Sequence, residues 1–233
     1  MSATNDAETT VARVSDETVP PKKGWGCLQW LVVGVILLLA LVFMPCTFNR
    51  VSYRAPMMQA SSNCRQILIA LKAYAGDHDG RYPDGNTANE AFRELFKAGL
   101  LDDERAFTGA SSPFEPDNNI GEAPNFDEAL VAGENHWAMT RGLKDSDSGN
   151  TPLVFENPVR AEWPPRWNMN ATGQKKEGRA WKSGRIIIGR NDGSVAGEVL
   201  NSTHGDAVPL KPDSTGKDLF EQAGPHEVLN VAR

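Results

Sequence analysis

The sequence predicts an α+β fold in which a long N-terminal helix, one half transmembrane and one half outside, packs on a small antiparallel β-sheet. Three observations carry this prediction: an uncharged apolar run at residues 24–49, an amphipathic helical pattern at residues 57–75, and short apolar runs of strand length after residue 150. A helix that buries one face against antiparallel strands is typical of the α+β class. The expected organisation is a polar N-terminus at 1–23, a transmembrane helix at 24–49, an α+β domain at 50–200 and an irregular tail at 201–233.

The apolar run is the first element, and its 26 residues between Lys23 and Arg50 carry no charge. A hydrocarbon layer about 30 Å thick needs roughly 20 apolar residues in a helix. Basic residues are retained on the cytoplasmic side, so Lys22 and Lys23 predict a cytoplasmic N-terminus. A cleaved secretory signal is the alternative, but its apolar core is usually shorter and ends in small residues, unlike the stretch around Cys46. We expect a retained single-pass anchor whose first partner is membrane lipid.

The remaining elements follow from periodicity and turn chemistry. Apolar residues recur at helical spacing in residues 57–75, where Gly76 ends the pattern, and again in the short segment 89–97. Residues 151–155 and 185–189 are apolar runs of strand length. The turn Asn191-Asp-Gly-Ser194 then predicts a hairpin whose second strand covers residues 195–200, because glycine supplies the positive φ that such turns need.

The start of the apolar run also resembles a known protein family. Type IV pilins and type II secretion pseudopilins begin with basic residues, a glycine at the cleavage point and Phe-Thr-Leu-Ile-Glu-Leu-Leu-Val-Val; the sequence here reads Lys22-Lys-Gly-Trp-Gly-Cys-Leu-Gln-Trp-Leu-Val-Val33. A later stretch is similar to a pseudopilin-like group of planctomycete and verrucomicrobial bacteria. It reads Asn63-Cys-Arg-Gln-Ile-Leu-Ile-Ala-Leu-Lys-Ala-Tyr-Ala75, with Asp-His-Asp-Gly-Arg-Tyr-Pro83 closely following. The match covers residues 22–83 well and 136–200 loosely.

The resemblance implies a pilin-like fold in the bacterial inner membrane, with a periplasmic C-terminal domain. It places processing between Gly24 and Trp25, and it places Gln29 and Pro45 at helix-packing positions of an assembly with other pseudopilin-like subunits. Gln29 stands where the family has a glutamate whose carboxylate faces the amine of a neighbouring subunit. The glutamine keeps the size and loses the charge, so processing is compatible with the sequence while polymerisation like that of a major pilin is in doubt.

Composition and motifs narrow the function further. The chain carries a net charge of −6, which argues against nucleic acid as a partner because phosphates need a basic footprint. Its three cysteines do not form a disulfide framework, since two of them lie in or beside the apolar run. The four histidines lack metal-ligand spacing, and no Gly-x-Ser-x-Gly or phosphate-binding glycine loop is present. The sequence therefore predicts no catalytic residues and no cofactor.

Calcium is the one ligand that the residues leave open. The turn from Asp77 to Asp84 has carboxylates at i and i+2 but lacks the distal glutamate of a calcium loop. Asp145 and Asp147 offer a second acidic loop, and the pseudopilin resemblance implies that such a loop can bind calcium. A solvated turn is the favoured interpretation of both.

Three functional hypotheses remain. The first is a non-enzymatic pseudopilin-like subunit of a pilus or type II secretion-like envelope assembly. The second is a permanently anchored binding or scaffold module with a pilin-like fold, which fold similarity alone cannot separate from the first. The third is a tethered hydrolase, which requires histidines and carboxylates to converge, so that changes at His136 or His204 would abolish activity.

Overall fold

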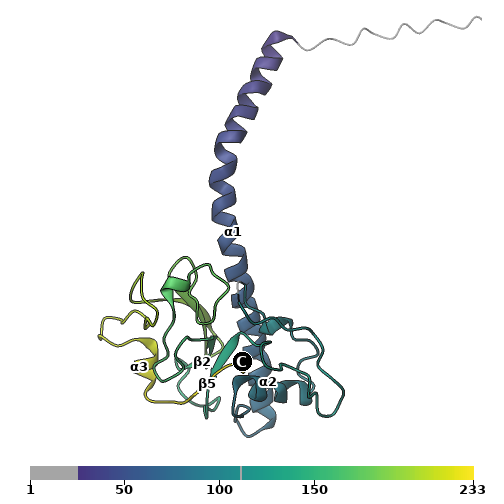
Figure 1. Ribbon diagram of the computed structural model, residues 1–233, viewed down its shortest axis with the longest axis vertical. Helices are drawn as coiled ribbons and strands as arrows, with labels where there is room; N and C mark the ends of the chain where they lie inside the picture. The colour runs from purple at the N-terminus through teal and green to yellow at the C-terminus, as the bar shows by residue number, and fades with distance from the viewer. Residues whose placement is uncertain (1–25, 111) are drawn as a thin grey trace, which may run out of the picture. The chain divides into compact units, whose positions relative to one another are not determined.

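The computed structural model describes residues 26–110 and 112–233, and for residues 41–53 it describes the backbone only (Figure 1). The chain divides into two compact units, Met1–Phe48 and Asn49–Arg233, and each is described by itself. The first helix, α1, spans Cys27–Asp77 and contributes to both units. Residues 201–233 belong to the second unit.

The structure is α+β with an antiparallel sheet, but the predicted architecture was wrong in its transmembrane half. Among the residues that the structure describes, no helix is both long enough and apolar enough to cross a membrane. This finding contradicts the single-pass anchor at 24–49 and, with it, the placement in a bacterial inner membrane with a periplasmic domain.

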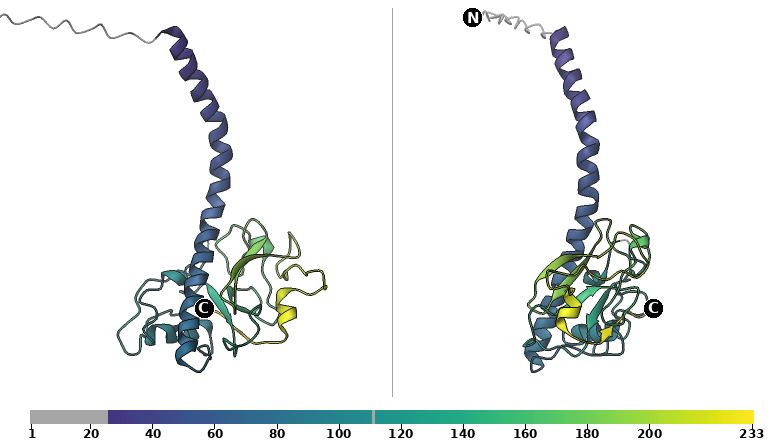
Figure 2. Two further views of the ribbon diagram at one scale, coloured as in Figure 1. Left: turned by 180° about the vertical axis from the view of Figure 1, so that it is seen from behind. Right: turned by 90° about the vertical axis from the view of Figure 1, so that its left-hand side faces the viewer.

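The second unit is built on a five-stranded antiparallel sheet in the order β4-β3-β2-β1-β5 (Figures 1 and 2). The expected strands and hairpin are present, with the hairpin turn at Gly193, whose φ of 85° suits glycine. Neighbouring strands exchange backbone hydrogen bonds, and a shift of register occurs in β2 between Pro152 and Val154. The bounds are β1 Trp137–Thr140, β2 Pro152–Glu156, β3 Arg185–Arg190, β4 Val195–Val199 and β5 Val228–Leu229.

Side chains alternate across this sheet and create two core layers. Ile187 of β3 points into the layer that contains α1, and its neighbours Ile186 and Ile188 point into the opposite layer. Such alternation follows from the period of two in a pleated strand. Because both faces of the sheet are covered, β3 is one continuous buried apolar run except at its two ends.

The helix α1 lies against the sheet at a position without a side chain. A Cβ atom placed on Gly189 of β3 would stand 2.6 Å from Leu68 Cδ1 and 2.7 Å from Cys64 Sγ, closer than any normal packing distance. Glycine at this point therefore lets the helix approach the strand. Burial also raises the pKa of the Cys64 thiol, which keeps that group protonated and inert.

Two further helices and the C-terminal segment complete the core. Helix α2, Ala88–Lys97, begins at Thr87, whose side chain accepts a hydrogen bond from Glu90 N, and it buries Phe92 and Phe96 in the α1 layer. Helix α3, Leu219–Ala223, places Phe220 in the opposite layer. The segment 201–233, expected to be irregular, thus supplies a helix, the edge strand β5 and core side chains. The two 3₁₀ turns are η1, Arg105–Phe107, and η2, Met169–Ala171.

Candidate functional site

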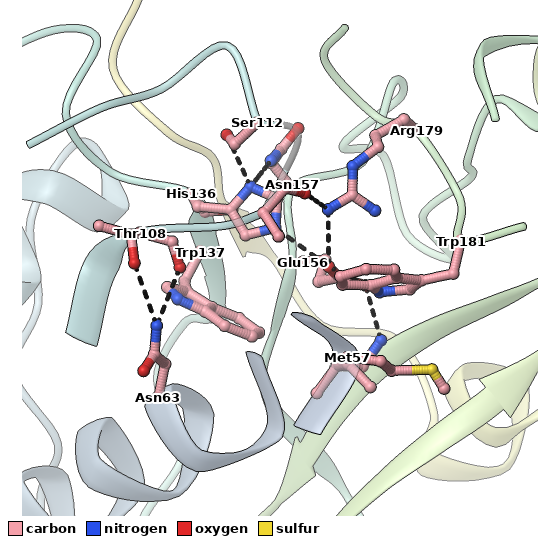
Figure 3. A network of polar contacts seen from close by, with 12 residues as sticks. Met57, Asn63, Thr108, Ser112, His136, Trp137, Glu156, Asn157, Arg179 and Trp181 are labelled. Carbon is pink, nitrogen blue, oxygen red and sulfur yellow. Dashed lines mark hydrogen bonds and ion pairs between the residues drawn. The ribbon is translucent and has the colours of Figure 1, made fainter. Parts of the chain in front are cut away.

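A buried polar network lies where residues 105–110, Ser112, β1, β2 and the segment before β3 meet (Figure 3). His136 directly precedes β1, Glu156 ends β2, and Arg179 lies shortly before β3. All three are almost completely buried. Charged side chains in such surroundings are stable only when each is paired and hydrogen-bonded.

Glu156 is the centre of the network, because its carboxylate accepts hydrogen bonds from three different elements. Trp181 Nε1 donates to both oxygens at 2.8 and 3.0 Å, Ile187 N donates to Oε2 at 2.8 Å, and His136 Nε2 lies 3.1 Å from Oε1. Arg179 Nη2 stands 3.6 Å from Oε1 and supplies the counter-charge. Burial alone would raise the pKa of this carboxyl, but the His136 hydrogen bond, Arg179 and the Ile187 amide outweigh it and lower the pKa.

The protonation of His136 follows from the orientation of Asn157. The Asn157 Oδ1 atom accepts a hydrogen bond from Gly178 N at 2.8 Å, which turns Nδ2 toward the ring, 2.8 Å from His136 Nδ1. Since an amide NH₂ donates, Nδ1 must be the unprotonated nitrogen, and the Nε2–H then donates to Glu156. Burial lowers the pKa of His136, in agreement with a neutral imidazole.

Ser112 joins the network on the other side of the ring. Its Oγ lies 3.0 Å from His136 Nδ1 and also accepts a hydrogen bond from Phe114 N at 3.0 Å. A serine, a histidine and a carboxylate in this order are the components of acyl-transfer triads. Here, however, Ser112 is only 2 % exposed, and His136 Nδ1 also accepts a hydrogen bond from Asn157 Nδ2. In this arrangement the hydrogen bonds of Ser112, His136 and Glu156 hold the segment around Ser112 against the sheet.

Close packing seals the network from several directions. A Cβ atom on Gly109 would collide with the His136 ring, and one on Gly178 would stand 2.4 Å from Val159 N. The Arg179 guanidinium lies 4.3 Å from the centre of the Trp181 ring and also donates to Ala110 O. The network therefore holds Gly109, Ala110, Ser112 and the segment before β3 in one arrangement.

A second polar group consists of three carboxylates, Glu104, Asp117 and Glu134, whose oxygens all lie within 4.8 Å of one another. Glu104 accepts hydrogen bonds from the backbone N–H groups of Leu130 and Asn118, and Glu134 accepts one from Val131. Burial, followed by repulsion between the carboxylates, raises the pKa of Glu134. Such a group has the ligand chemistry for a hard cation, but its hydrogen bonds already account for it as a set of loop caps.

The residues singled out from the sequence lie elsewhere and are not brought together. Asp147 Oδ2 accepts a hydrogen bond from Lys144 N at 2.7 Å, and Asp145 N donates to Gly80 O, so their loop is closed by its own backbone contacts. Gln29 Oε1 accepts a hydrogen bond from Gly26 N at 3.1 Å at the start of α1. Calcium binding by Asp145 and Asp147 and helix packing by Gln29 stay predictions. Gly24, Trp25 and the side chain of Pro45 lie outside the described residues.

Sequence reasoning missed most of the network. His136 was considered only as a hypothetical hydrolase residue, and its proximity to Glu156 was not predicted. A signal was available for Glu156, since a carboxylate that ends a run as apolar as Pro152–Phe155 must be buried with a partner. Arg179 and Ser112 sit in loops without periodicity, and no local pattern marks them.

Comparison with known proteins adds no family or fold assignment. No protein-family model, no curated protein and no solved structure matches the chain. The resemblance to pseudopilins therefore rests on the sequence motifs alone.

Proposed function

We propose that this protein is a non-enzymatic structural subunit that assembles with copies of itself through residues 28–39 of α1, as the pseudopilin-like motifs around this segment imply. One observation carries the proposal. All of the segment's large apolar side chains except the partly exposed Val33 are about half exposed or more: Leu28, Trp30, Leu31, Val32, Val35, Ile36, Leu37, Leu38 and Leu39. We call residues 28–39 the apolar segment.

The distribution of these side chains favours several partner helices over one. Successive residues of an α-helix are rotated by about 100°, so ten apolar positions among twelve residues point in all directions around the axis. A helix that is apolar all round is normally buried on every side. A single binding groove covers only one stripe, whereas equivalent helices from identical subunits surround the segment with repeated contacts. Exposed apolar surface of this extent marks an interaction site.

The buried network fits a structural subunit as well. Its serine, histidine and carboxylate hold a loop against the sheet and are closed to a substrate in this arrangement. The network rigidifies the second unit, Asn49–Arg233, and a rigid unit suits a subunit that occupies a repeated position in an assembly.

Energy transfer between chains labelled at Cys27 tests the proposal. Cys27 is exposed beside the apolar segment and Cys64 is buried, so a maleimide dye attaches selectively at Cys27 once Cys46 is replaced by serine. Donor-labelled and acceptor-labelled chains are mixed and the transfer efficiency is measured. We expect transfer that is lost in Ile36→Glu and kept in Ile69→Glu. Both isoleucines are exposed on α1, at 59 % and 63 %, but only Ile36 lies in the apolar segment. Absence of transfer in the parent chain, or equal loss in both variants, would contradict the proposal.

A further inference from the structure

A groove of about 470 Å³ runs along α1 within the second unit. Its lining alternates basic, apolar and small polar side chains at the spacing of one helical face. The lining residues are Arg54, Met57, Met58, Ser61, Ser62 and Arg65. We call this surface the Arg–Met face.

The floor of the groove is apolar and adaptable. Met58 is 73 % exposed, the largest exposed fraction among the apolar side chains described beyond residue 40. Met57 is partly buried against the core, and its Cε lies 3.7 Å from the Cβ position of Gly197 in the edge strand β4. Methionine side chains are flexible and polarisable, so they fit partners of varied shape. An exposed methionine beside a sheet edge therefore offers an anchor point for an apolar side chain of a partner.

The two ends of the face carry unneutralised positive charge. Arg54 and Arg65 are both exposed, and neither takes part in an ion pair within the described part of the chain. The whole chain has a net charge of −6, so this pair of guanidinium groups stands out against an acidic background. They lie 11 positions apart, which is three turns of helix or about 16 Å. The charge pattern is complementary to carboxylates at the same separation.

We propose that the Arg–Met face docks an acidic amphipathic helix of a partner protein, with two carboxylates three turns apart that pair with Arg54 and Arg65. Apolar side chains between those carboxylates contact Met57 and Met58. Helix-in-groove recognition uses anchors at i, i+3, i+4 and i+7, and the residues of this face recur at that spacing. Arginine favours such a partner because its planar guanidinium binds a carboxylate through two parallel hydrogen bonds. The inference goes beyond the proposed assembly, since it uses another part of α1 and a different partner.

Binding of a synthetic peptide tests this inference on the full chain. The probe is a fluorescent helical peptide with two glutamates three turns apart, on the same face as two leucines. A control peptide carries lysines in place of the glutamates and is otherwise identical. Fluorescence anisotropy is measured with the parent chain and with Ile36→Glu, in which the proposed self-assembly is disrupted, so the two proposals can fail separately.

We expect the acidic peptide to bind both chains and the lysine peptide to bind at least tenfold more weakly. Combined Arg54→Glu and Arg65→Glu changes should weaken binding of the acidic peptide by about tenfold or more, since each exposed pair contributes a few-fold and reversal adds repulsion. The control Arg81→Glu makes the same charge change at an exposed position off the face and should alter binding by less than about twofold. Equal binding of both peptides, no binding, or sedimentation showing that a second copy of the chain occupies the face would overturn the inference.

Discussion

Replacement of Glu156 by glutamine probes the buried network most sharply. Glutamine keeps the size of the side chain but exchanges one acceptor oxygen for an NH₂ group. If the amide oxygen takes the Oε1 position, the NH₂ faces Ile187 N–H, which then lacks an acceptor, and Trp181 Nε1–H keeps only its hydrogen bond to the remaining oxygen. Arg179 loses its buried counter-charge at the same time. Breaking a buried pair from one side typically costs about 3–5 kcal/mol of unfolding free energy.

The assay is thermal and urea unfolding, followed by tryptophan fluorescence, because Trp181 lies inside the network. For a unit of this size, 3–5 kcal/mol corresponds to a fall in Tm on the order of 10 °C. Glu227→Gln is the matched control, since Glu227 pairs with Arg141 at 3.0 Å on the exposed surface and its loss should cost less than about 1 kcal/mol. If Glu156→Gln were no more destabilising than Glu227→Gln, the assignment of Glu156 as the centre of the network would be refuted.

Three further predictions concern packing and pH, each checked by urea unfolding. Gly189→Ala should lower the unfolding free energy by about 1–3 kcal/mol, because the new methyl group enters space held by Cys64 and Leu68. In the control Gly76→Ala the methyl group meets no atom within 4 Å, so the unfolding free energy should not change. Equal effects of the two substitutions would contradict the close approach of α1 to β3. The pKa of His136 is lowered by burial, so below pH 6.5 the unfolded chain binds a proton that the folded chain does not. The unfolding free energy should therefore decrease as the pH is lowered from 7 to 5. If the unfolding free energy of His136→Gln depended on pH in the same way, burial of His136 would not be the cause. The pKa of Glu134 is raised by burial and then by Glu104, so its ionised form opposes folding at pH 7. Glu134→Gln should therefore raise the unfolding free energy at pH 7 and leave it unchanged below about pH 4, and a lower unfolding free energy at pH 7 would contradict this.

Local patterns predicted several elements of the second unit. The apolar runs that became β2 and β3, the Asp-Gly turn and the short amphipathic helix α2 each need only a few neighbouring residues to be recognised. The same local reasoning failed for the apolar run at 24–49. Hydropathy predicted a membrane span there, and the structure describes no helix that meets the requirement.

Long-range pairing explains the other failures. Ser112 and Arg179 are 67 positions apart in the sequence, and they join one network through His136 and Glu156 only because the sheet brings β1, β2 and β3 side by side. Phe220 looked like part of a polar tail, yet it packs edge-on against Phe155, with ring centres 5.1 Å apart. Neither contact has a periodic signature, so a single sequence offers no way to anticipate them.

The oligomeric state of the full chain tests the central claim most directly. Sedimentation velocity at several protein concentrations distinguishes a monomer from a discrete assembly and reports how the equilibrium shifts. The proposed subunit role predicts a concentration-dependent oligomer in the parent chain and in Ile69→Glu, and a monomer in Ile36→Glu. A parent chain that sediments as a monomer across the concentration range would contradict assembly through the apolar segment.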